Sequence, residues 1–147
     1  IYSHENGHDD GQPLGAEPVG LSSYIQSAFL DVDDGDHFML IRRIIPDVNF
    51  TNSDLTNSVT GDPLVPAVDM TISVSKFPGA APSTTNAAGV TTTDSITTTA
   101  TIDLYTNQVF IRARGRAMAF KISSDMVGVQ WQLGSNRIDA RVDGLRG

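Results

Sequence analysis

The sequence predicts an all-β protein: an antiparallel two-layer sandwich, jelly-roll-like, with about seven or eight strands. Three observations support this prediction. Apolar and polar residues alternate with a period of two along much of the chain, no segment keeps the 3.6-residue period of a helix, and groups of Gly, Pro, Asn and Asp separate the alternating segments. With 147 residues, of which 39% are hydrophobic, the chain fits one globular domain, residues 1–147, with its own core.

The first two predicted strands cover 24–32 and 37–45. The segment 37–45, HFMLIRRII, is apolar on both faces except for Arg42 and Arg43, which predicts a central strand. Between the two strands lies DDGD at 33–36. Because Asp-Gly readily supplies the positive φ of tight turns, this segment predicts a hairpin turn.

Four further segments alternate in the same way. The segment 68–77 places Val68, Met70, Ile72 and Val74 on one face and mostly hydroxyl groups on the other. The segments 96–104, 127–133 and 137–143 repeat the pattern, and in 127–133 the apolar set includes Trp131. These segments predict half-buried antiparallel strands, with Trp131 between the sheets.

Two polar segments predict long exposed and flexible loops, near 51–66 and near 77–95. The second is rich in Pro, Gly, Ala and Thr. Shorter turns are expected at 105–108 and 133–136.

Charge is distributed unevenly along the chain. The formal net charge is −7, which argues against a general nucleic-acid binder. Residues 1–41 hold eight acidic residues and no Lys or Arg, whereas residues 112–147 hold seven basic and three acidic residues. The two ends could attract each other, or could join different copies of the chain. The alternative is that these charges simply solvate exposed strand faces.

The segment 110–122, FIRARGRAMAFKI, concentrates this positive charge. Arg112, Arg114 and Arg116 share one face of a regular strand, but so do Met118, Phe120 and Ile122. A bulge or bend near Gly115 would resolve the conflict. The arginines would then form an exposed basic row beside a buried end.

Sites for chemistry are sparse. The chain has no Cys and no nucleophile motif or phosphate-binding glycine loop, so we expect no enzymatic activity and no cofactor. DVDDGDH at 31–37 departs from the calcium loop of EF-hands at its sixth and twelfth positions, and an acidic turn is the simpler interpretation. His4 and His8 lie near acidic residues, but Asn6-Gly7 predicts a turn there.

The closing block resembles a known family. The residues of this block that carry the resemblance are Arg114-Gly115-Arg116, Met118, Lys121-Ile122, Gly128, Trp131, Leu133-Gly134, Arg137, Asp139, Arg141, Asp143-Gly144 and Arg146. A second block is DGDHFMLIRRIIPD at 34–47. Together they are similar to the C-terminal region of the tail nozzle proteins of short-tailed bacteriophages (podoviruses). These are also called tail tubular or packaged-DNA stabilisation proteins.

The resemblance implies a structural protein of the virion, located in the phage tail. Family members form rings, generally of six copies, below the portal and adaptor, and the rings extend the channel that retains and releases packaged DNA. DNA would pass through this channel without sequence-specific binding, and no membrane span is expected. Since family members are much longer, this chain would be a C-terminal part of such a protein. The expected contact residues are Arg112, Arg114, Arg116, Arg137, Arg141 and Arg146.

Two other functions stay open at this point. One is a carbohydrate-binding β-sandwich module with a calcium ion held by the loop residues Asp31, Asp33, Asp34 and Asp36, and with Trp131 as a platform for a sugar ring. The other is a hydrolase with an unrecognised pair of carboxylates. The low aromatic content, 7%, argues against the sugar-binding module.

Overall fold

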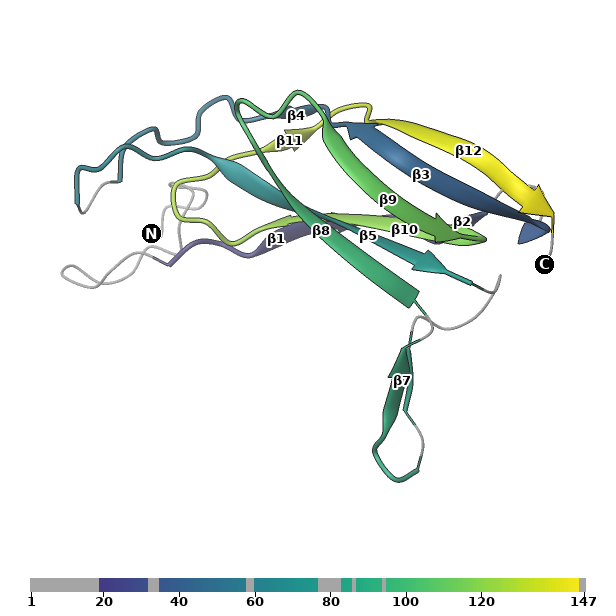
Figure 1. Cartoon of the computed structure of the whole chain (residues 1–147). Helices are drawn as coiled ribbons and strands as arrows, with labels where there is room; N and C mark the ends of the chain where they lie inside the picture. Colours follow the sequence, from purple (N-terminus) through teal and green to yellow (C-terminus); the bar gives the residue numbers. More distant parts are fainter. Residues whose placement is uncertain are drawn as a thin grey trace.

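The structure, a computed structural model, describes residues 19–31, 35–57, 60–76, 83–85, 87–93 and 95–145. All regular elements in these residues are strands, and all their pairings are antiparallel. Figure 1 shows the two layers that the main sheets form. The predicted fold class is therefore confirmed. No helix in the described residues is long and apolar enough to cross a membrane.

The lower layer in Figure 1 is a five-stranded sheet with the order β1-β10-β5-β8, and β2 also pairs with β10. Its strands are β1 (Ser23–Gln26), β2 (Leu30–Asp31), β5 (Ala67–Ser75), β8 (Ser95–Asp103) and β10 (Ala117–Ser124). The β5–β8 pairing runs without interruption over nine residues of each strand.

The upper layer is a three-stranded sheet with the order β12-β3-β9. Its strands are β3 (His37–Ile45), β9 (Val109–Gly115) and β12 (Arg137–Leu145). The prediction that 37–45 is a central strand is confirmed, because β3 lies between β12 and β9. Nearby, the short strands β4 (Val48–Asn49) and β11 (Gln132–Leu133) pair with each other.

The core lies between the two layers. The predicted inward set of 68–77 is confirmed, since all four of its apolar side chains are buried on β5. They pack with buried residues of the opposite sheet and of β8 and β10, including Met39, Ile41, Ile44, Ile102, Ile111 and Ile122.

Gly115 marks the place where the chain changes sheets. The strand β9 ends at this residue in the upper layer, and β10 begins at Ala117 in the lower layer. A Cβ atom on Gly115 would lie 2.7 Å from the carbonyl oxygen of Ser75, so the crossing leaves no room for a side chain. Arg116 then donates its backbone N–H to the same carbonyl, at 2.8 Å. The predicted bend is thus confirmed.

Several local predictions are wrong. The described residues form twelve strands rather than seven or eight, because short pairs such as β4–β11 add to the six long strands. Segment 33–36 does not close a hairpin, since β2 and β3 belong to different sheets. Only Gly35, with a φ of 74°, and Asp36 of that segment are described.

Of the two polar segments, only 77–95 differs from the prediction. The 51–66 segment contains no strand in its described residues, only an isolated bridge between Thr56 and Pro63. The 77–95 segment, expected to be a loop, contains a hairpin of β6 (Ser83–Thr85) and β7 (Thr91–Thr93). This hairpin projects from the two layers (Figure 1).

Segment 127–133 is a strand only at β11. Gly128 has a φ of 72° and lies in a turn, so the alternation of this segment does not continue along a strand. Trp131 is half-buried, packs against the core and donates its indole N–H to Ser23 Oγ at 3.0 Å.

Candidate functional site

Two adjacent arginines on β3 point outward because the strand contains a register shift. Ile41 and Ile44 are both buried, although residues three apart in a regular strand face opposite sides. The shift lies between them: Ile41 pairs with Ala113, but Arg43 pairs with Phe110. The pairing with β12 shifts at the same place. A bulge of this kind adds a residue to one face, so Arg42 and Arg43 both reach solvent while the core contacts continue.

The outer side of the upper layer collects most of the basic residues of the C-terminal half. Pairing and burial place six arginines and two aspartates of the described residues on this side. We call this surface the arginine face, and it consists of Arg42, Arg43, Arg112, Arg114, Arg137, Arg141, Asp139 and Asp143, together with the apolar Phe38, Leu40 and Phe110. It is net positive in a chain of net charge −7.

One end of the arginine face is held by internal contacts. The guanidinium carbon of Arg114 lies 4.1 Å from the centre of the Phe38 ring, and that of Arg116 lies 4.9 Å from it. Arg114 also forms an ion pair with Asp143, with 2.5 Å between Nε and Oδ2. These contacts hold Arg114 within the chain and occupy its donors.

Arg43 also has contacts within the chain. Its Nη2 lies 3.8 Å from Asp139 Oδ2, and its Nη1 donates to Gln108 Oε1 at 3.4 Å. Its buried Nε has no hydrogen-bond partner in the described residues. The ion pair is half exposed, so it contributes only a fraction of a kcal/mol, about 0.2–1 kcal/mol at most.

Arg42 and Arg112 differ from these residues. Both are exposed, and within the described part of the chain neither has an ion pair or a side-chain hydrogen bond. They line an open groove of about 760 Å³ with Arg43, Leu40 and Phe110, which is 74% exposed.

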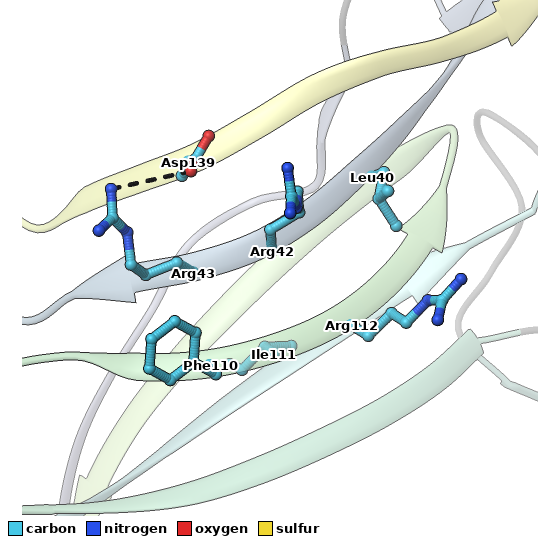
Figure 2. Close-up of a pocket in the computed structure, with 7 residues that line it drawn as sticks. All are labelled: Leu40, Arg42, Arg43, Phe110, Ile111, Arg112 and Asp139. Atoms are coloured by element: carbon cyan, nitrogen blue, oxygen red, sulfur yellow. Dashed lines mark ion pairs between the residues drawn. The ribbon is translucent and has the colours of Figure 1, made fainter.

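The arginines around this groove do not converge on one point. Figure 2 shows Arg43 turned toward Asp139, Arg42 projecting between β3 and β12, and Arg112 extending away from both. Convergent forks would suit one small anion, whereas diverging forks suit carboxylates spread over a larger surface. The groove therefore fits an extended acidic partner with an apolar part for Phe110.

Most of the residues predicted as contacts lie on or beside this face. Arg112 and Arg114 are exposed on β9, Arg137 and Arg141 are exposed on β12, and Arg116 is half-buried at the sheet crossing. Arg146 lies outside the described residues.

Sequence reasoning missed Arg42 and Arg43 as part of the site. The sequence pattern identifies them only as interruptions of a central apolar strand. A usable signal was present, because two adjacent arginines between pairs of apolar residues in a strand can both reach solvent only at an irregularity.

The residues proposed for calcium are only partly described. Asp31 ends β2 and Asp36 precedes β3, while Asp33 and Asp34 lie outside the described residues, as do His4 and His8. The described residues contain no group of three or more His, Asp or Glu side chains placed to hold a metal ion. Trp131, the candidate sugar platform, packs against the core through part of its surface.

The chain was also compared with known proteins. No protein-family model matches it, and no curated protein matches it. The functional argument therefore depends on the geometry above and on the resemblance in the sequence.

Proposed function

We propose that this chain is a non-enzymatic structural subunit of a virion, part of the tail nozzle of a short-tailed bacteriophage. In this function the arginine face contacts an acidic protein surface, either on a neighbouring copy in a ring or on another tail component. The ring would surround the channel through which packaged DNA leaves. The resemblance of 34–47 and 114–146 to nozzle proteins supplies the virion context.

The observation that carries the proposal is the arginine face itself, together with the separation of charge along the sequence. The arginine face is net positive, and residues 1–36 of the same sequence hold eight acidic residues and no Lys or Arg. A subunit of a closed ring needs two different surfaces that fit each other. Opposite charge on the two surfaces would steer copies, or acidic tail partners, into register.

Arg42 and Arg112 are the residues through which the contact would be strongest. Both lack an internal ion pair in the described residues, so their donors are available for carboxylates without the loss of an existing contact. Arg114 and Arg43, which already have internal partners, would orient the contact rather than bind the partner strongly.

The experiment is to image particles that carry Arg42→Glu and Arg112→Glu together, by electron microscopy. We expect the unchanged chain in a symmetric ring below one capsid vertex, and fewer copies per particle in the double variant. The loss should be larger at low ionic strength, where exposed charges interact over longer distances. Exposed substitutions of this kind usually change stability by less than about 0.5 kcal/mol, so the variant should still fold.

Lys76→Glu is the matched control, because Lys76 is exposed and follows β5 in the opposite sheet. It changes the charge as much as Arg42→Glu or Arg112→Glu alone does, so it is compared with each single variant as well as with the double variant. Absence of the chain from particles would overturn the virion assignment. Equal incorporation of the arginine and lysine variants would show that the arginine face is only solvated.

A further inference from the structure

The strand β8 forms one edge of the five-stranded sheet and lacks the usual protection of an edge. It pairs with β5 on one side, and in the described residues no strand pairs with its other side. Natural edges carry charges, prolines or bulges that prevent pairing with other chains. Along Ile96–Ile102 there is no charged residue, no proline and no register shift.

The opposite edge of the same sheet is also open. It consists of β1 and β2, which both pair with β10 and have no second partner strand in the described residues. All four residues of β1 are exposed. The strand β8 is Ser95–Asp103, and the other edge extends from Ser23 to Asp31 with an irregularity at 27–29, between β1 and β2.

The two edges run in opposite directions. Four strands form the path β1-β10-β5-β8, and every pairing in it is antiparallel, so β1 and β8 are antiparallel to each other. A second copy related by rotation about an axis along the strands would therefore present β1 antiparallel to the first copy's β8. The same operation, repeated, gives a ring with one continuous antiparallel sheet.

Apolar side chains support this contact from the same side of the sheet. Ile96 pairs with buried Val74, and Ile25 pairs with buried Ile122, so both face the inner side. Despite this, Ile96 is 54% exposed and Ile25 is 48% exposed. Leu30, opposite Met118, is half-exposed on the inner side too. Joining the edges would cover these side chains at both edges.

Charge does not oppose the contact. In the antiparallel arrangement Asp103 at the end of β8 and Asp31 at the end of β2 lie at opposite ends of the joint, so like charges do not meet. A contact of two β8 strands would also avoid a clash, but it would leave Ile25 and Leu30 uncovered.

We propose that copies of this chain join head to tail, with the β8 edge of one copy pairing with the β1–β2 edge of the next. This contact would close the ring of the proposed function. The ring rests on that function, whereas the contact between two copies does not. Its contacts are backbone hydrogen bonds and apolar side chains. They should persist at high salt, unlike contacts of the arginine face, which lies on the other sheet.

The test uses sedimentation of the purified chain at high salt, with Ile96→Lys and Ile25→Lys. Each substitution places a charge on the inner side of one edge, where an isolated copy leaves it in solvent but a joint would bury it. We expect assemblies larger than dimers for the unchanged chain and monomers for each variant. An equal mixture of the two variants should give dimers, because each retains one intact edge. Leu55→Lys, at an exposed position in the 51–66 segment, is the control and should assemble normally.

Three results would overturn the proposal. The unchanged chain could remain monomeric at high protein concentration, or Ile96→Lys could assemble normally while its melting temperature is unchanged. The third result is dimerisation of Ile25→Lys alone, which would indicate pairing of two β8 strands. None of these results bears on the arginine face, whose loss of contact is measured at low salt with Arg42 and Arg112.

Discussion

The strands β8 and β12 are both nine residues long, and each lies at the edge of its sheet, but they are built differently. On β12 charged side chains alternate along the strand, and the pairing with β3 shifts register twice. On β8 the pairing is regular and Asp103 is its one charged residue. The difference shows that alternation predicts a strand in both cases, while charges and bulges decide whether its edge can take another strand.

The largest expected difference between the two strands concerns burial. Ile102 on β8 is 1% exposed, whereas Val142 on β12 is 60% exposed, although both occupy apolar positions of an alternating pattern. Ile102→Ala should reduce the free energy of unfolding by about 2–5 kcal/mol through lost burial and a cavity. Val142→Ala should change it by less than about 0.5 kcal/mol. Urea denaturation of both variants measures this, and similar losses would contradict the difference in burial between Ile102 and Val142.

The next effect concerns the second register shift of β12. Gly144 lies at this shift with a φ of 82°, and no atom lies within 4 Å of the place where a Cβ would be. Gly144→Ala should therefore cost about 1–2 kcal/mol from the backbone conformation alone. Gly61→Ala, with a φ of 76° in the 51–66 segment, should cost a similar amount. Amide hydrogen exchange along β12 should become faster in Gly144→Ala but not in Gly61→Ala. An unchanged exchange rate in Gly144→Ala would show that the register shift does not depend on this glycine.

A smaller effect on stability is expected from the ion pair between Arg114 of β9 and Asp143 of β12. A double-mutant cycle of Arg114→Gln and Asp143→Asn should give a coupling of about 0.2–1 kcal/mol, decreasing with salt, because both side chains are about half exposed. Arg114→Gln alone should cost more than Asp143→Asn alone, since it also removes the contact with the Phe38 ring. Thermal melts at low and high salt measure the coupling, and a salt-independent value would be contrary to expectation.

The smallest effect is at the end of β8 and depends on pH. The hydroxyl of Thr106 donates to Asp103 Oδ1 at 2.7 Å, and this bond, with the backbone N–H of Tyr105, lowers the pKa of Asp103 below its ordinary value. The carboxylate therefore stabilises the folded chain above its unfolded-state pKa, and this contribution is lost as the pH falls through the lower folded-state pKa. Stability measured against pH should show a smaller acid-side decrease in Asp103→Asn. An identical pH profile would indicate that the turn does not depend on the charge.

The sequence allowed prediction of the fold class, the core face of β5, the central position of β3 and the bend at Gly115. These features follow from local alternation and from the space a residue requires. Other features depend on partners that are distant along the chain. The register shift that turns both Arg42 and Arg43 outward is fixed by β9 and β12 together. Val142, which alternation assigned to the core, is exposed and lies directly before the second register shift of β12.

Site prediction had the same limits. The row Arg112 and Arg114 was visible from spacing, because both lie on one strand. The internal ion pair of Arg114 with Asp143 was not, since it joins two strands that are not neighbours in the sheet. Only the folded structure distinguishes the arginines that have internal partners from Arg42 and Arg112, which have no ion pair in the described residues.

The position of β3 between β9 and β12 also has a consequence for the order of folding. Ile45 pairs with Arg137, so most of the chain separates the two halves of this pairing. The ladders of β3 with β9 and β12 can form only after residues 109–145 have been synthesised. The lower layer can pair β5 with β8 much earlier, since their residues are closer in the sequence. The arginine face therefore forms only after β12 has been synthesised, later than the pairing of β5 with β8.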